Sequence, residues 1–349
     1  MSFEFITDLK RWQQLFETLP DFCGKVYYQP DYYRAYAANG DGQPAALYFK
    51  QGTTEIFYPF LLRPIPECIG GKGFFDMQTA YGYGGPVIFG ITPKTATEYC
   101  KSYTEWADNT NIVAEFVRFN PLLDSNLTAE IYKLEVNRKT VSMDLSENFA
   151  SILQQSASAR QRNYRKAVKA GLKFVTLPDL SSFIEMYRQT MQRLTADEYY
   201  YFSSEYFAVL ESLPENSRLF AGVENNNCEL LATGIYLLDR QSVHYHLGAS
   251  TGAEKELQPN AFMMLEAARH TAQAGKNVLH LGGGLSFAED DGLYRFKSGF
   301  SRQRHDFYIA RKIHRPQQYK QFSDAWRAIT GKEPGILLHY HEGLQHADI

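Results

Sequence analysis

Residues 279–300, LHLGGGLSFAEDDGLYRFKSGF, carry the most information about how this chain folds. The apolar start predicts a buried strand, and three glycines follow it, Gly282 and Gly283 among them. Glycines at a strand end let the backbone come close to a ligand or to another chain. An acidic loop then leads into a short helix that holds Phe296 and an exposed cation, Lys297. This unit suits the binding of an anion or of a developing oxyanion, and a simple glycine turn is the alternative.

The bulk composition favours a cytoplasmic protein of two domains. The chain has 349 residues, 44% of them hydrophobic, and a net charge of −3. The chain is too long to fold around one ordinary hydrophobic core, which predicts two domains. Its negative net charge argues against a generally basic nucleic-acid binder. Four widely spaced cysteines suggest no disulfide framework, which fits a reducing compartment. The N-terminus lacks the apolar region of a signal peptide, and no run approaches the ~20 apolar residues of an integral membrane segment.

The order of strand and helix patterns predicts an α/β protein with mixed sheets. We expect a first domain over 1–139, a second over 140–330 and a C-terminal tail over 331–349. The second domain would begin with a strand at 140–145. Ser146 is expected to cap the helix that follows, which runs with a possible break to residue 170, where Gly171 ends it. Further strands are predicted at 172–177, 217–223, 230–238 and 242–248, with a helix at 260–274 and a strand at 306–311.

A basic run lies early in this second domain. Residues 148–178 contain six cations and no acid. On a helix, Arg162, Arg165, Lys166 and Lys169 share one face, which we call the cationic face, while Val168 lies on the opposite face, expected to be buried. Like charges at this spacing repel each other, and bound phosphates would offset the repulsion. A solvated helix face with acids nearby is the alternative.

Other polar residues suggest weaker hypotheses. His244 and His246 share one side of a strand, yet no third ligand stands at metal spacing, so we expect no metal. Tyrosines such as Tyr201 suit stacking on bases or sugars, and packing between domains is the alternative. Asp291, before the short helix, is interpreted as a helix cap rather than as a base.

Several segments together resemble the Fem-type (peptidoglycan bridge-forming) transferases and related acyltransferases with two GNAT-like domains. The segments are SARQRNYRKAVKAGLKF (158–174), FIEMYRQTMQRLTADEYYYF (183–202), LQPNAFMMLEAARHTAQAGKNVLHLGGG (257–284), DGLYRFKSGF (291–300) and FYIARKIHRPQQY (307–319), with QPDYYRAYAANG (29–40) and EFVRFNPLL (115–123) in the first half. The resemblance covers most of the chain. It implies tandem GNAT-like (acyl-CoA N-acyltransferase) domains and a substrate channel across the second.

The resemblance also implies a function. Fem enzymes move an amino acid from aminoacyl-tRNA to an amine of a lipid- or nucleotide-linked cell-wall precursor. The lysine of their Phe-Lys motif matches Lys297, which we expect to be catalytic, and Arg193 matches a position that contacts substrate phosphates. The expected substrate-binding residues are Arg160, Arg162, Arg165, Lys166, Arg193, Tyr201, His246, Asn260, Gly282, Gly283 and Phe296.

The leading hypothesis is therefore an acyltransferase that modifies an amine of a cell-envelope or polysaccharide precursor. No permanently bound cofactor is expected. The donor would carry phosphate and is either acyl-CoA or aminoacyl-tRNA. The chain lacks the long helical hairpin of several Fem enzymes, and its second domain lacks the usual GNAT pyrophosphate signature, which weakens but does not exclude coenzyme A. An acyl-CoA-dependent N-acetyltransferase acting on a nucleotide-linked amino sugar or another small amine is the first alternative, and a non-catalytic RNA- or glycan-binding module is the second.

Overall fold

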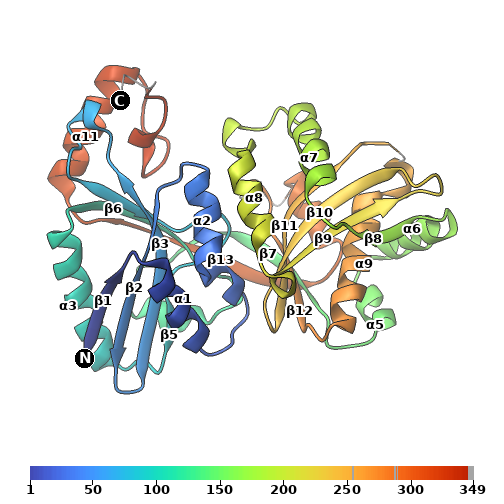
Figure 1. Cartoon of the computed structure of the whole chain (residues 1–349), viewed down its shortest axis with the longest axis horizontal. Coiled ribbons are helices and arrows are strands. Elements are labelled where there is room, and N and C mark those ends of the chain that lie inside the picture. Colours follow the sequence, from blue (N-terminus) through green and yellow to red (C-terminus); the bar gives the residue numbers. More distant parts are fainter. Residues whose placement is uncertain (254, 287, 289, 345–349) are drawn as a thin grey trace. The chain divides into compact units, whose positions relative to one another are not determined.

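The computed structural model describes residues 1–253, 255–286, 288 and 290–344, and it divides into two compact units. Unit 1 contains Met1–Leu19, Tyr28–Val136 and the chain from Tyr308 onward, and unit 2 contains Pro20–Tyr27 and Asn137–Phe307. The main segment of unit 2 begins along strand β7 (Glu135–Asp144) and ends along strand β13 (Gln303–Ile313) (Figure 1).

The strands of unit 1 form a mixed sheet in the order β1-β2-β3-β4-β6-β13. The pair β4–β6 is parallel and the other neighbours are antiparallel. Strand β13 pairs with β6 from Ile309 to Ile313, so the chain from Tyr308 onward belongs to unit 1. The second domain expected from the sequence extended to residue 330. The bounds are β1 Ser2–Ile6, β2 Gln43–Gln51, β3 Thr54–Pro64, β4 Phe75–Gln78 and β6 Ile112–Arg118, with β5 Val87–Phe89 added beside β3.

Helices cover both faces of this first sheet. Side chains alternate along β3, so Tyr58 and Phe60 share a core with helix α3, whereas Phe57 meets Trp12 of helix α1. Helix α11 packs on β6 through a smaller cluster that includes Phe322 and Trp326. The helices are α1 Leu9–Thr18, α2 Pro30–Ala38, α3 Pro93–Asn109, α4 Ser125–Ala129 and α11 Pro316–Thr330.

Unit 2 repeats the same strand layout with other segments of the chain. Its order is β8-β9-β10-β11-β12-β7, in which β11–β12 is the parallel pair and the other neighbours are antiparallel. Each unit is thus a run of four antiparallel strands, then a parallel neighbour, then an antiparallel last strand. The mixed α/β fold expected from the sequence is confirmed. The remaining bounds are β8 Lys173–Thr176, β9 Arg218–Glu224, β10 Leu230–Leu238, β11 Ser242–Ser250 and β12 Val278–Gly282.

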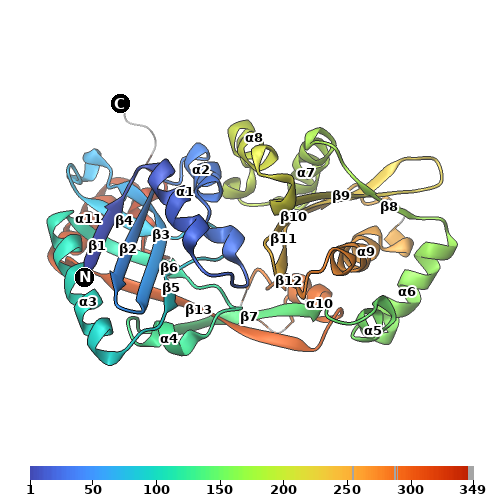
Figure 2. The ribbon, with the colours of Figure 1, turned by 60° about the horizontal axis from the view of Figure 1, so that its bottom comes forward.

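The helices of unit 2 also lie on two faces of its sheet. Helices α7 and α8 lie on one side of β9 and β10, and α9 and α10 lie on the other (Figure 2). Helix α9 supplies most of the core on its side, with Met263, Met264 and Leu265 fully buried. The bounds are α5 Phe149–Gln154, α6 Ser158–Lys169, α7 Ser181–Arg193, α8 Ser204–Ser212, α9 Pro259–Gln273 and α10 Gly292–Ser298.

The long helix predicted after residue 146 is divided in two. Helix α5 is capped by Asn148, whose side chain accepts a hydrogen bond from the Ser151 amide, so the assignment of Ser146 as the cap was wrong. Ser146 instead hydrogen-bonds to Asp144. Gly171, with φ of +83°, follows the end of α6 as expected, because this left-handed conformation favours glycine.

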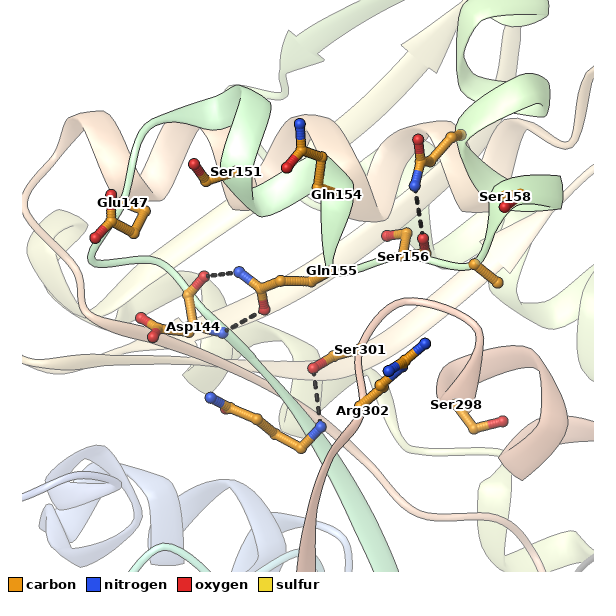
Figure 3. Close-up of a pocket in the computed structure, with 13 residues that line it drawn as sticks. Asp144, Glu147, Ser151, Gln154, Gln155, Ser156, Ser158, Ser298, Ser301 and Arg302 are labelled. Carbon is orange, nitrogen blue, oxygen red and sulfur yellow. Dashed lines mark hydrogen bonds between the residues drawn. The ribbon is translucent and has the colours of Figure 1, made fainter.

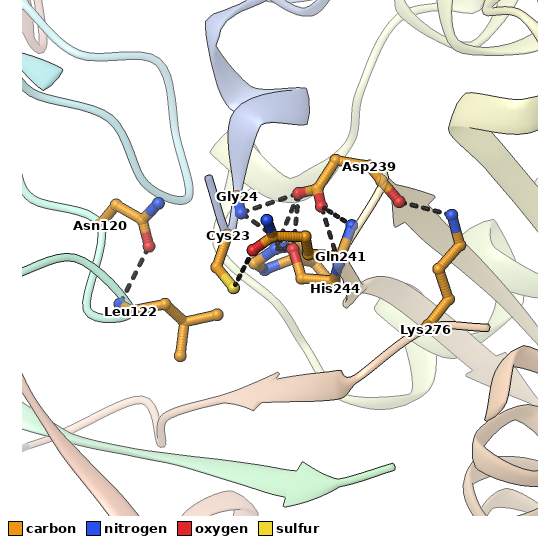
Figure 4. A network of polar contacts seen from close by, with 9 residues as sticks. Cys23, Gly24, Asn120, Leu122, Asp239, Gln241, His244 and Lys276 are labelled. Atoms are coloured by element: carbon orange, nitrogen blue, oxygen red, sulfur yellow. Dashed lines mark hydrogen bonds and ion pairs between the residues drawn. The ribbon is translucent and has the colours of Figure 1, made fainter. Parts of the chain in front are cut away.

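A short N-terminal segment, Pro20–Tyr27, packs into unit 2 through Asp239 (Figure 4). The amide of Gly24 donates hydrogen bonds to Oδ2 of Asp239 at 2.7 Å and to Oγ of Ser242 at 2.9 Å. The same carboxylate accepts the hydroxyl of Ser242 and the amides of the turn between β10 and β11. One buried acid therefore fixes both the turn and the segment.

Candidate active site

The parallel strands β11 and β12 separate midway along β11. They pair at Ser242–Val278 and Val243–Leu279, and the described pairing ends at His244–His280, although β11 continues to Ser250. In unit 1 the matching strands stay joined beyond β4, because the amide of Thr79 donates to Phe116 and that of Gly84 to Arg118. Backbone that stops pairing inside a sheet leaves room and hydrogen-bonding groups for a ligand. The opening between strands is therefore a feature of unit 2.

A β-bulge lies at this opening. Strand β11 places one extra residue, His246, between the pairs Tyr236–Tyr245 and Ile235–Leu247. The bulge puts Tyr245 and Gly248 on the same side of the strand, where a Cβ atom at Gly248 would overlap the tyrosine hydroxyl. Glycine at position 248 is therefore what lets the Tyr245 ring lie along β11.

Lys297 lies at the end of β12, and it is buried rather than exposed as the sequence suggested. The residue retains 8% exposure, and its Nζ donates a hydrogen bond of 2.9 Å to the carbonyl oxygen of Gly283. Nζ also lies 5.8 Å from the centre of the Tyr245 ring. Burial lowers the pKa of Lys297 to about 8, with Asp291 opposing the shift and Arg138 adding to it. An ammonium has three donors, so two remain for a ligand.

Asp291 fixes the helix that carries Lys297. It caps α10 by accepting the Tyr294 amide at 2.8 Å, and its other oxygen accepts the amides of Leu285 and Ser286. Burial alone would raise the pKa of Asp291, but the hydrogen bonds from Tyr294, Ser286 and Leu285 outweigh it and lower the pKa. The carboxylate thus ties the glycine-containing loop to α10, as the interpretation of a cap required.

A cavity of about 330 Å³, which we call the α9 pocket, lies where β11 leads into helix α9. Four residues selected from sequence line it together: Arg160, Arg193, Asn260 and Phe296. The amino end of α9 contributes Pro259 and Asn260, and the positive end of a helix dipole favours anions. None of the described lining residues is acidic.

Arg160 and Arg193 are held in different ways. Arg160 donates to Oε1 of Gln258 at 2.6 Å and lies 4.6 Å from the centre of the Phe296 ring. Burial lowers the pKa of Arg160, although a guanidinium stays charged at neutral pH. Arg193 is exposed and donates to the carbonyl oxygens of Ser250 and Thr251. These partners are neutral, so both positive charges remain available to an anion.

The α9 pocket contains one polar atom without a partner and one strained residue. Oδ1 of Asn260 is buried and makes no hydrogen bond within the described chain. Gln258 has a φ of +50°, which is uncommon for a residue with a side chain. Such strain gathers where the surrounding structure serves a function.

The cationic face does not join the α9 pocket. Arg162, Arg165, Lys166 and Lys169 are exposed, and none of them is among the residues that line the pocket. Val168 is 51% exposed, so its assignment to a buried face was wrong. It lies instead beside a separate cavity between α6 and the far end of α9. Charge and apolar surface are thus both present on the outside of α6.

The other predicted residues lie at varied places. Gly282 ends β12, where it pairs with Val141 of β7, and Gly283 supplies the carbonyl that Lys297 contacts. Tyr201 is 42% exposed and follows a short 3₁₀ turn. His246 shares a hydrogen bond of 2.7 Å with the hydroxyl of Tyr206, and burial lowers its pKa to about 3, aided by His244.

Two findings concern metals and membranes. Within the described residues, no group of three or more His, Cys, Asp or Glu side chains could hold a metal ion. No helix in the same part of the chain has the length and apolar character needed to cross a membrane.

Sequence reasoning missed Tyr245, Ser250 and Gln258, all of which shape this region. Ser250 takes part through its backbone carbonyl, and Gln258 through a positive φ and a side chain that accepts from Arg160, none of which a residue pattern reveals. Pro259 was the available signal, because proline is common at the first position of a helix. It marks the start of α9 and hence the edge of the α9 pocket.

Comparison with known proteins agrees with this geometry. Residues 155–298 match the model of the Acetyltransferase (GNAT) domain family, a range that includes Arg160, the α9 pocket and Lys297. The protein is therefore an acyltransferase whose second unit carries a GNAT domain, and the resemblance found in the sequence is confirmed. Among curated proteins, no sequence matches this chain.

Solved structures share the fold of most of the chain. FemX matches with a TM-score of 0.69 at 12% identity over 92% of this chain and 99% of its own. The C-terminal domain of a putative lysylphosphatidylglycerol synthetase from Agrobacterium fabrum matches with a TM-score of 0.56 at 13% identity, over 94% and 98%. L-PGS from Bacillus licheniformis matches with a TM-score of 0.57 at 12% identity, over 91% and 96%. At these identities the likeness concerns the fold.

Proposed function

We propose that unit 2 transfers an acyl or aminoacyl group from a phosphate-bearing donor to an amine of a cell-envelope or polysaccharide precursor. The observation that carries the proposal is the α9 pocket, where Arg160, Arg193 and the positive end of α9 meet without a described acid. Phosphates would bind there, and the acyl carbonyl would reach into the opening between β11 and β12.

Lys297 would act on the carbonyl. When the amine attacks the carbonyl carbon, a C–N bond forms and negative charge grows on the oxygen. The two free donors of the Lys297 ammonium would stabilise this charge, and burial would strengthen the interaction. The C–S or C–O bond to the donor then breaks, and the amine proton passes to water or to the leaving group. No side-chain base is needed for this sequence.

Coenzyme A is the donor that the α9 pocket favours. The pocket belongs to the part of the chain that matches an acetyltransferase domain, and its size suits a few phosphate oxygens rather than a nucleic acid. The usual pyrophosphate signature is a glycine-rich loop. In this chain, arginines of α6 and α7 would bind the phosphates instead.

Aminoacyl-tRNA is the second candidate donor, and the exposed cationic face favours it. Four cations lie on the outside of α6, where an extended polyanion could bind. The fold shared with FemX and with a lysylphosphatidylglycerol synthetase domain supports a Fem-like role in the cell envelope.

The test is a thermal-shift comparison of coenzyme A, acetyl-CoA and aminoacyl-tRNA, followed by transfer assays with amine acceptors. A donor at ~100 times its dissociation constant stabilises the folded state by about 2.7 kcal/mol, which shifts the melting temperature measurably. Stabilisation by acetyl-CoA and transfer of its acetyl group support the first donor. If none of the three donors binds or reacts, the proposed function is wrong.

A further inference from the structure

Unit 2 contains a further cavity, larger than the α9 pocket, which we call the polar cavity. It is open to solvent and has a volume of about 820 Å³, within the ~300–1,000 Å³ of typical small-molecule sites. Its wall consists of the end of β7, helix α5, the first turn of α6, and the chain from Ser298 to Gln303. Figure 3 shows Ser151 and Gln154 of α5 on one side, with Ser298, Ser301 and Arg302 on the other. Nothing in the proposed acyl transfer uses this cavity.

The wall of the polar cavity is built by hydrogen bonds. The side-chain amide of Gln155 donates to the carbonyl of Asp144 and accepts from its amide, which fixes α5 to β7. Ser156 donates to the carbonyl of Phe300 at 3.0 Å, and the amide of Ala157 donates to Gly299 at 2.9 Å. Hydrogen bonds between its own elements therefore hold the wall of the cavity in place before any ligand binds.

The chemistry of the lining selects a class of ligand. Nine of its thirteen residues are serine or glutamine, and Ala157 is the one apolar residue described there. Hydroxyl and amide groups of this kind favour a polar ligand over an acyl chain, which needs continuous apolar walls. The lining contains one cation, Arg302, and two carboxylates, Asp144 and Glu147. Because the negative charges outnumber the positive one, the cavity would not favour a polyphosphate.

Several of these groups are available to a ligand. The hydroxyls of Ser151 and Ser158, the amide of Gln154 and the guanidinium of Arg302 make no side-chain hydrogen bond within the described residues. Hydroxyls and amides both donate and accept, as the hydroxyls of a sugar do. Their spread over opposite walls matches a ligand with polar groups around its edge.

We propose that the polar cavity is a binding site for a neutral saccharide about the size of a disaccharide. It is separate from the α9 pocket, because Arg160 and the Phe296 ring on which it packs line the pocket and not the cavity. Ser158 and Gln161 of the same helix α6 line the polar cavity instead. This inference concerns binding and stands whether or not Lys297 is catalytic.

The test is isothermal titration of the full chain with N,N′-diacetylchitobiose and with maltose, using ADP as an anionic comparison. Ser151→Trp fills the cavity from the side of α5. The hydroxyl of Ser151 makes no hydrogen bond within the described residues, so its loss should leave folding intact. Ser182→Trp is the matched control, because Ser182 is an exposed serine in the first turn of α7. Thermal melting verifies that both variants fold.

We expect at least one of the two disaccharides to bind wild type and Ser182→Trp alike. Ser151→Trp should weaken that binding at least tenfold, and Gln154→Leu should weaken it in the same direction if the tryptophan variant fails to fold. ADP should not compete. The proposal is overturned if neither sugar binds the wild type, if Ser151→Trp and Gln154→Leu both bind as the wild type does, or if ADP displaces the sugar. A failure here leaves acetyl transfer intact, so the two proposals fail separately.

Discussion

The ammonium of Lys297 donates to the carbonyl oxygen of Gly283 at 2.9 Å, which joins helix α10 to the end of strand β12. This bond gives the lysine a structural role whatever its catalytic role is. A substitution at position 297 must therefore be assessed for stability and for rate.

Lys297→Met should reduce turnover on the order of a hundredfold or more, about 2.7 kcal/mol of transition-state stabilisation. Donor affinity should survive, because the opposed charge develops mainly in the transition state. The melting temperature should change little, since the lost hydrogen bond to Gly283 is offset by removal of a buried charge. Single-turnover transfer measures the rate. Equal rates for wild type and variant would remove Lys297 from the mechanism.

The activity that depends on Lys297 should fall as pH rises through about 8, where the buried ammonium loses its proton. Lys297→Arg, partly active, should not show this fall, because its guanidinium stays charged. Stability should move the other way. The folded pKa lies below the ordinary value of 10.5, so between about 8 and 10.5 the unfolded chain binds more protons and the free energy of unfolding rises with pH. Rate profiles and urea titrations on both sides of pH 8 test this, and a wild-type profile parallel to that of Lys297→Arg would contradict it.

The two sets of arginines should separate the two donors. If coenzyme A is the donor, Arg160→Gln with Arg193→Gln should raise its KM on the order of tenfold and flatten the salt dependence. The matched variant, Arg162→Gln with Arg165→Gln, should leave the KM of coenzyme A unchanged. If tRNA is the donor, this second variant should weaken binding and reduce its salt slope. If only the variant of the cationic face lost affinity for coenzyme A, the phosphates would bind at that face and not in the α9 pocket.

Gly248→Ala should displace the ring of Tyr245, because the added Cβ would overlap the tyrosine hydroxyl. Since Nζ of Lys297 lies near this ring, we expect turnover to fall several-fold, although Lys297 itself is not substituted. Adding Tyr245→Phe should restore part of the rate by removing the overlapping oxygen. A double-mutant cycle measures this coupling. If the effects of the two substitutions are additive, Gly248 is not required because of the Tyr245 hydroxyl.

The strand and helix pattern was largely predictable from the sequence, because alternation and glycine positions act locally. The strands around residues 112–119, 230–238 and 242–248 and helix α9 were found close to their observed bounds. The first strand, Ser2–Ile6, and helix α1 were not found, since charged residues interrupt their apolar pattern.

The candidate site was predictable in part. Arg160, Arg193, Asn260 and Phe296 were selected for separate reasons, and the fold brings them to one pocket. Helical spacing also grouped Arg162 and Arg165, but spacing does not say which side of a helix meets a cavity. The exposure of Lys297 was misjudged for a similar reason, because its burial depends in part on Tyr245 of β11, which is distant in the sequence. Whether these residues serve catalysis stays a prediction.

The extra residue in β11 makes this strand sensitive to length as well as to sequence. Deleting His246 would restore an unbroken ladder with β10, yet every following side chain would change faces. Leu247 and Ala249 would exchange places with Gly248 and Ser250, and the room beside Tyr245 would be lost. Related sequences that keep this opening should therefore tolerate substitution at this position far better than a one-residue deletion.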